Sequence, residues 1–171
     1  MGKMNVTNSF HVLFLCTGNI CRSPMAEGVL RQMLIEESVP GVVVASAGIA
    51  AASGFPASAH AVTACRERGI DISGHRSRPL TREILAETDL VLTMEMHHLY
   101  AAKSFSPGCA DRMYLLSHYA EGTEDAAPFG VEDPIGGDLD EYRAALTTIG
   151  AYLEKALPRI AEVIRTSARE S

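Results

Sequence analysis

The sequence predicts an α/β protein in which a parallel β-sheet is covered by helices on both faces. Short, continuous apolar runs alternate along the chain with stretches whose apolar residues recur every three or four positions. A strand–helix–strand–helix order of this kind forms a parallel sheet between two helical layers. Neither a repeat nor a linker-like tract interrupts the 171 residues. We therefore expect one domain over residues 1–171, with an ordered core from about residue 10 to 164 and short flexible ends.

Each element is indicated by its own local pattern. The predicted strands are HVLFL (11–15), VVVASAG (42–48), LVLTM (90–94) and the less apolar DRMYLL (111–116). The predicted helices cover residues 24–35, residues 57–69 with Gly69 as the stop signal, residues 81–89, and a long segment from Leu139. Pro158 should kink or restart that last helix, and residues 166–171 are typical of a frayed tail.

Composition excludes several kinds of partner. The net charge is −6 without a cluster of Lys and Arg, which argues against nucleic acid or an anionic membrane as the main partner. No apolar stretch approaches the ~20 residues that span a bilayer. The N-terminus has too short an apolar region for a secretory signal, and Val6 stands where a myristoylation motif requires Ser or Thr. The sequence predicts a cytoplasmic protein without membrane insertion.

Metal ions and other cofactors are not expected. The 4 cysteines are too few for a disulfide scaffold, and no C-x-x-C pair suggests structural zinc. His97 and His98 are adjacent, and adjacent residues on a helix point to different sides.

The segment CTGNICR (residues 16–22) is suited to hold a phosphate-sized anion. Successive N–H groups between a strand and a helix can form a nest, and the helix N-terminus adds positive charge. Gly18 and Asn19 tolerate the left-handed backbone that such a loop needs. Ser23 followed by Pro24 is typical of an N-cap and the first helical position. The residues expected to surround the anion are Thr17, Gly18, Asn19, Ile20, Cys21 and Arg22.

Cys16 is a candidate nucleophile at the carboxyl end of the first strand, where parallel sheets bind ligands. A helix N-terminus and a nearby arginine lower the pKa of a thiol from about 8.5, which would give a thiolate at neutral pH. Arg22 offers a planar fork for two phosphoryl oxygens. The alternative, an inert buried cysteine, is disfavoured by the strand before the loop and the helix after it.

A reaction at a phosphomonoester also needs an acid for the leaving oxygen. Residues 118–138 form a long, acidic segment rich in Gly and Pro, and such loops are typically functional or mobile. Asp133, stiffened by Pro134, is the best candidate acid; its rival is Glu132, and a plain turn is the alternative.

Taken together, CTGNICRSPMAEG (16–28), SAG (46–48), His75 and the Asp-Pro before the last helix resemble the low-molecular-weight protein tyrosine phosphatases. The resemblance extends from about residue 10 to 164. It implies a small doubly wound, four-stranded parallel sheet. It also implies hydrolysis of protein phosphotyrosine through a phosphocysteine intermediate, with no cofactor. A phosphorylated protein would be the partner, and phosphate or another oxyanion would occupy the active site.

The resemblance assigns roles to individual residues. It makes Cys16 the nucleophile, Arg22 the phosphate clamp and Asp133 the general acid and later the base. Ser23 would lower the thiol pKa and help the sulfur leave.

Further roles concern the support and protection of the loop. Asn19 would hold the strained backbone through hydrogen bonds to Ser46 and His75. Cys21 matches a second loop cysteine that can form a reversible disulfide with Cys16, although it could instead be a small packing residue.

Two departures leave the substrate open between phosphotyrosine and phosphoarginine. Ile135, followed by two glycines, stands where phosphotyrosine-specific members often carry aromatic residues, and this pattern is more similar to bacterial arginine phosphatases. That branch typically has Thr at the position of Ile20, whose apolar side chain suits an aromatic ring better than a guanidinium. We therefore favour phosphotyrosine. Phe55 or Phe129 could supply the missing aromatic wall, although core packing is the favoured role for both.

Two other functions are less favoured. Arsenate reductases of the same fold need two further cysteines a few residues apart, whereas Cys65 and Cys109 are 44 positions apart. A phosphate-binding module that had lost catalysis would lack the nucleophile, the clamp or the acid, and this sequence has all three.

Overall fold

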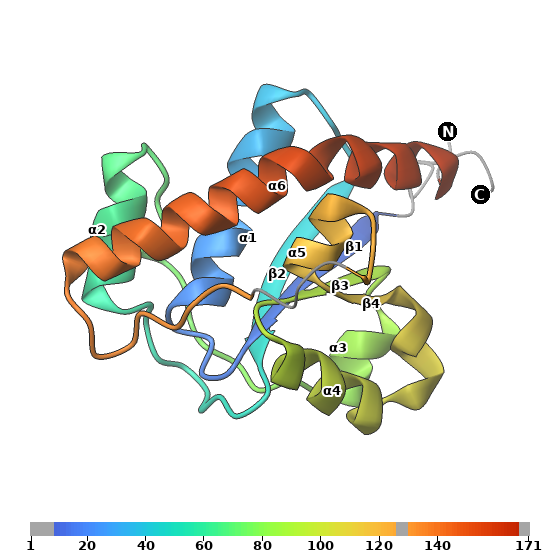
Figure 1. Cartoon of the computed structure of the whole chain (residues 1–171), viewed down its shortest axis with the longest axis horizontal. Helices are drawn as coiled ribbons and strands as arrows, with labels where there is room; N and C mark the ends of the chain where they lie inside the picture. The colour runs from blue at the N-terminus through green and yellow to red at the C-terminus, as the bar shows by residue number, and fades with distance from the viewer. Residues whose placement is uncertain (1–8, 126–129, 168–171) are drawn as a thin grey trace, which may run out of the picture.

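The computed structural model describes residues 9–125 and 130–167. Its centre is a four-stranded parallel sheet in the order β2-β1-β3-β4 (Figure 1). The strands are β1 (Phe10–Cys16), β2 (Val42–Gly48), β3 (Leu90–Thr93) and β4 (Met113–Leu115). The predicted α/β fold, a small doubly wound parallel sheet of four strands, is confirmed.

Helices cover the sheet on both faces. One face carries α1 (Arg22–Glu36), α2 (Ala59–Glu67), α5 (Leu116–Glu121) and α6 (Leu139–Ser167), and the other carries α3 (Arg82–Ala86) and α4 (Met96–Phe105) (Figure 1). A 3-10 helix, η1 (Pro107–Arg112), precedes β4.

The apolar run of β1 reflects its place inside the sheet. Val12 and Phe14 belong to the cluster beneath α1 and α6, while Leu13 and Leu15 belong to the cluster beneath α3 and α4. Because successive side chains of a strand point to opposite faces, a strand covered on both faces must be apolar at every position. This packing fixes the carboxyl end of β1, where the candidate site begins.

One helix start was predicted wrongly, and one of the two alternatives for the last helix, a restart at Pro158, is excluded. Helix α1 begins at Arg22, so Ser23 lies inside the helix rather than at the N-cap, which is Cys21. Helix α6 does not restart at Pro158 but continues as one helix to Ser167. Buried residues on both sides of that proline, among them Leu153 and Ile160, pack into the same core and outweigh the lost backbone hydrogen bond.

Two helices were not predicted at all. Helix α4 follows β3, and α5 occupies residues 116–121, so the expected loop of residues 118–138 is shorter than predicted. Among the helices described, none is long and apolar enough to cross a lipid bilayer.

Candidate active site

The loop between β1 and α1 holds a strained backbone at the carboxyl edge of the sheet. Asn19 has φ 56°, one of two positive values at non-glycine residues in the described part of the chain. Gly48, at the end of β2, lies so close that a Cβ there would be 2.5 Å from the Thr17 carbonyl oxygen and 3.0 Å from the Asn19 nitrogen. The SAG segment therefore ends in glycine because the loop packs directly against it.

Hydrogen bonds to Asn19 maintain this strained conformation. Its carbonyl oxygen is 2.6 Å from His75 Nε2, and its Oδ1 accepts from the backbone N–H of Arg78 at 2.9 Å. Since a backbone N–H can only donate, the second contact fixes the orientation of the amide. Asn19 Nδ2 then donates to Ser46 Oγ at 2.9 Å and to Ser23 Oγ at 2.8 Å. The structure thus places Asn19 against Ser46 and His75.

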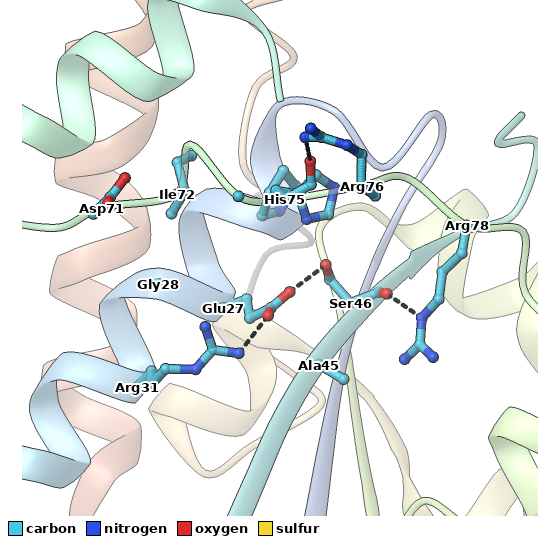
Figure 2. Close-up of a pocket in the computed structure, with 12 residues that line it drawn as sticks. Glu27, Gly28, Arg31, Ala45, Ser46, Asp71, Ile72, His75, Arg76 and Arg78 are labelled. Atoms are coloured by element: carbon cyan, nitrogen blue, oxygen red, sulfur yellow. Dashed lines mark hydrogen bonds and ion pairs between the residues drawn. The ribbon is translucent and has the colours of Figure 1, made fainter. Parts of the chain in front are cut away.

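The direction of the remaining hydrogen bonds follows from that amide. Ser23 Oγ accepts from Asn19, so its own hydrogen is left for Cys16 Sγ, 2.9 Å away. Ser46 likewise donates its hydrogen to Glu27 Oε2 at 2.6 Å, and Arg31 donates to the other oxygen of that carboxylate (Figure 2). A continuous chain of hydrogen bonds therefore runs from Glu27 to the sulfur of Cys16.

Figure 2 also shows a pocket beside the Glu27 end of this chain of hydrogen bonds. Glu27, Ser46 and His75 line a pocket of about 500 Å³ between α1, β2 and the segment of residues 71–78. The pocket lies beside the groups that support the loop. Cys16 is not among its lining residues.

The pKa of the Cys16 thiol is raised, whereas the sequence analysis expected it to be lowered. Burial raises the pKa of Cys16, and this effect outweighs the groups that lower it: the Ser23 hydroxyl, backbone N–H groups of Ser23 and Asn19, and the charge of Arg22. The predicted causes of lowering are therefore present, but the cost of placing a thiolate in a buried position is larger.

Arg22 is buried, with 1% of its surface exposed, and is held by three acceptors. Its Nη1 donates to Glu95 Oε2 at 2.6 Å and to the Val131 carbonyl oxygen at 2.8 Å. Its Nη2 lies 3.1 Å from Asp133 Oδ2. The guanidinium thus connects the loop after β1 with the segment before α6.

Asp133 lies on a tight turn that directs its side chain toward Arg22. Its Oδ1 accepts the backbone N–H of Ile135 at 3.2 Å, and Gly136 adopts φ 78°. Neighbouring Glu132 is exposed and makes no ion pair within the described residues. The structure therefore brings Asp133, rather than its rival, to the site.

The residues predicted from the sequence also include Cys21 and several apolar side chains. Cys21 is a free thiol near Tyr142 Oη (3.3 Å) and Ser58 Oγ (3.6 Å). Ile20 is half-buried in the loop, Phe55 is 57% exposed and Ile135 is 61% exposed. Phe129 lies outside the described residues.

Glu95 and His98 are functional candidates that the sequence analysis did not identify. His98 Nε2 is 2.9 Å from Thr17 Oγ1, and Glu95 holds Arg22. A signal was present in the sequence, because Glu95 lies just after the carboxyl end of β3, the strand beside β1, and His98 lies in the first turn of the helix that follows.

Together with His97, Glu95 and His98 form a cluster of side chains of the kind that can hold a metal ion. Ligand atoms of Glu95, His97 and His98 lie within 4.8 Å of one another, and the two rings are 4.0 Å apart, so the expectation that they point to different sides was wrong. Nδ1 of His98, however, accepts the backbone N–H of Glu95, which leaves the ring hydrogen on Nε2. With both nitrogens used, His98 does not offer a lone pair to a metal ion.

Comparison with known proteins identifies the family. The family model described as low molecular weight phosphotyrosine protein phosphatase matches residues 11–167. The chain belongs to this family.

Relatives within the low-molecular-weight phosphatase family carry two activities in their names. A probable low molecular weight protein-tyrosine-phosphatase, EpsP, from Ralstonia nicotianae is 38% identical over 87% of this chain and 94% of its own. A protein-arginine-phosphatase from Geobacillus stearothermophilus is 37% identical over 92% of this chain and 97% of its own.

A solved structure of the family bears on the chemistry. It is described as a YwlE arginine phosphatase variant with a phosphorylated active-site serine, where a cysteine has been replaced. It is 32% identical with a TM-score of 0.83 and covers 95% of this chain and 100% of its own.

Proposed function

We propose that this phosphatase hydrolyses protein phosphotyrosine through a phosphocysteine formed on Cys16. The observation that carries the proposal is the meeting of three groups around one loop: the Cys16 thiol, the buried Arg22 guanidinium and the Asp133 carboxylate, 3.1 Å from Arg22. A nucleophile, an anion clamp and an acid are the set that transfer of a phosphoryl group to a thiol requires.

In the first step, Arg22 and the N–H groups of the loop hold the phosphoryl oxygens. The phosphoryl dianion competes with Asp133 for Arg22, which frees the Asp133 carboxylate to take the proton of the Cys16 thiol. The resulting thiolate attacks phosphorus, and an S–P bond forms while the P–O bond to the tyrosine oxygen breaks. Asp133 then gives its proton to the leaving phenolate, whose conjugate acid has a pKa of about 10.

In the second step, water attacks phosphorus while the Asp133 carboxylate takes a proton from it. The S–P bond breaks, and inorganic phosphate leaves. The Ser23 hydroxyl, which donates to Cys16 Sγ at 2.9 Å, stabilises the departing thiolate. Water and the phosphoester are the two reactants, so the atoms balance without a cofactor.

The apolar surroundings of the loop support phosphotyrosine as the substrate. Ile20 lies in the loop itself, and Phe55 and Ile135 expose apolar surface that an aromatic ring can cover. A guanidinium would need polar partners that these side chains cannot supply.

Phosphoarginine is the second candidate. The two glycines after Ile135 and the similarity to the Geobacillus stearothermophilus protein-arginine-phosphatase, at 37% identity, favour it.

We also propose reversible oxidation of the site in a cytoplasmic setting. A peroxide would convert the Cys16 thiolate to a sulfenic acid, and the Cys21 thiol would then attack that sulfur, releasing water and forming a disulfide. Cytoplasmic thiols would reduce this bond and restore the nucleophile. Two free cysteines in one loop of six residues support this proposal.

The test compares two peptides of one sequence, carrying either phosphotyrosine or phosphoarginine. We expect faster turnover of the phosphotyrosine peptide and no turnover by Cys16→Ser. Asp133→Asn should lower kcat by about 10²- to 10⁴-fold, the usual contribution of general acid catalysis. Glu132→Gln, a matched change at the neighbouring exposed carboxylate, should behave like the wild type.

Three outcomes would contradict parts of this proposal. Preference for phosphoarginine would select the second candidate. Loss of activity in Glu132→Gln but not in Asp133→Asn would reassign the acid. Turnover that survives Cys16→Ser would exclude the phosphocysteine route altogether.

A further inference from the structure

His98 occupies an unusual position for a histidine that makes no contact with the reacting groups. Its side chain is fully buried, with 0% exposed, at the start of α4. Burying an imidazole is unfavourable unless both of its nitrogens find partners. The partners here belong to two parts of the active site, which suggests more than a packing role.

The first contact fixes the state of the ring. The backbone N–H of Glu95 donates to His98 Nδ1 at 3.0 Å, so the neutral ring carries its hydrogen on Nε2. That hydrogen points to Thr17 Oγ1, 2.9 Å away. The Thr17 oxygen is therefore the acceptor, and the ring acts as a one-way donor toward the phosphate loop.

Thr17 transmits this contact to the loop backbone. It follows Cys16 directly, and its carbonyl oxygen accepts the N–H of Ala50 at 3.0 Å. With the side chain held by His98 and the carbonyl held by Ala50, the peptide plane between Thr17 and Gly18 has little freedom to rotate. That peptide is part of the nest of N–H groups expected to bind phosphoryl oxygens.

The contact between His98 and Glu95 also connects the ring to Arg22. Glu95 Oε2 accepts from Arg22 Nη1 at 2.6 Å, and the N–H that His98 accepts belongs to the same residue. The ring therefore joins the loop on one side to the residue that orients the guanidinium on the other.

We propose that His98 is a positioning residue of the phosphatase: through Thr17 and Glu95 it sets the relative placement of the phosphate loop and the Arg22 guanidinium. This inference rests on the proposed function of the Cys16 site. In this role His98 does not contact the substrate. His98 keeps the N–H groups of the loop and the Arg22 guanidinium, which together hold the phosphoryl oxygens, in one geometry. This geometry matters most in the transition state.

Two substitutions separate this role from a merely structural one. Asn can place an acceptor near the position of Nδ1, so His98→Asn should keep the contact with Glu95 and lose the donor to Thr17. Gln can extend a donor toward the position of Nε2, so His98→Gln should keep the contact with Thr17. His97→Gln, at the exposed neighbouring histidine, is the matched control.

The experiment measures kcat and KM with p-nitrophenyl phosphate, binding of vanadate by calorimetry, and thermal unfolding for all variants. We expect His98→Asn to lower kcat and vanadate affinity by about tenfold, the effect of one lost hydrogen bond in a buried site, with a smaller change in KM. His98→Gln should retain most of kcat. Thr17→Val should reproduce the loss, and adding His98→Asn to it should cause little further loss.

The outcomes distinguish the inference from the proposed function. If the wild type shows no Cys16-dependent turnover, the proposed function fails, whereas vanadate binding and the ring nitrogen NMR signals of His98 still report on the contact. Full activity and vanadate affinity in His98→Asn would overturn the positioning role. So would multiplicative losses in the double variant, because independent effects would mean that His98 does not act through Thr17. A ring hydrogen on Nδ1 would overturn it as well.

Discussion

At the scale of single residues, a substitution of Ser23 tests how the thiolate form of Cys16 is stabilised. Its hydroxyl is the strongest of the groups that lower the Cys16 pKa against the effect of burial. Ser23→Ala should therefore raise that pKa further. Alkylation by iodoacetamide, followed against pH with Cys16→Ser as the blank, should be slower than in the wild type at neutral pH. An unchanged pH profile would show that the hydrogen bond at 2.9 Å does not act on the thiolate.

Ile20 tests the choice of substrate. Ile20→Thr replaces an apolar side chain in the loop with a hydroxyl that can pair with a guanidinium. The ratio of kcat/KM for phosphotyrosine to that for phosphoarginine should fall by about tenfold, the usual effect of one polar group. Ile20→Val, which keeps the apolar character, is the control. A ratio that stays constant would place the specificity in the turn around Ile135.

Sequence reasoning named the residues proposed to react and, through the family resemblance, the supports Asn19, Ser46 and His75, but it missed Glu95 and His98. Cys16 and Arg22 are recognisable because strand, loop and helix follow one another along the chain. Glu95 and His98 are 73 and 81 positions from the residues they contact, so only their place after the third predicted strand could have indicated them. Ser23 was misplaced as an N-cap because the Ser-Pro pattern is local, whereas the sulfur and the amide that occupy its hydroxyl are set by the folded loop.

At the scale of elements, the end of β2 sets the space for the loop. Gly48→Ala would place a Cβ 2.5 Å from the Thr17 carbonyl oxygen, a distance that requires the backbone to move. We expect a loss of about 1–3 kcal/mol in the free energy of unfolding, typical of overpacking. The value of kcat should fall with it. Urea titration and steady-state kinetics measure the two effects.

Gly108→Ala is the control for that substitution, because a Cβ at this position meets nothing within 4 Å and the residue lies outside the loop. Wild-type stability in Gly48→Ala would show that the loop accommodates the methyl group without strain.

The strands were easier to predict than the short helices. A strand buried on both faces is apolar throughout, so β1 and β3 were found to within one residue at each end. The edge strand β2 was found from its β-branched run ending at Gly48. Helices α4 and α5 have 10 and 6 residues and depend on packing against the sheet for their stability. Their sequences alone, which include adjacent histidines, carry too weak a helical pattern.

At the scale of the whole molecule, His98 should make the fold sensitive to acid. Burial, followed by the charges of His97 and Arg22, lowers its pKa to about 3. In the unfolded chain the pKa is about 6.5, so below that pH the unfolded state binds more protons. Stability is therefore complete above pH 6.5 and falls as the pH drops, by at most about 1.4 kcal/mol per pH unit.

Urea titrations at pH 7, 6 and 5 measure this dependence. His98→Gln should show a weaker loss of stability between pH 7 and 5 than the wild type, whereas His97→Gln should not. Equal slopes for the wild type and His98→Gln would mean that other groups cause the acid sensitivity.

The burial of Arg22 also has a consequence for biosynthesis. Two of its three acceptors, Glu95 and Val131, follow it by 73 and 109 residues. At a synthesis rate of about 5–20 residues per second, the last of them leaves the ribosome roughly 5–20 s after the arginine. A guanidinium buried without a partner costs several kcal/mol, so α1 should not dock fully on the sheet during that interval. The groups that bind phosphate would then come together only near the end of translation, which keeps the nascent chain inactive.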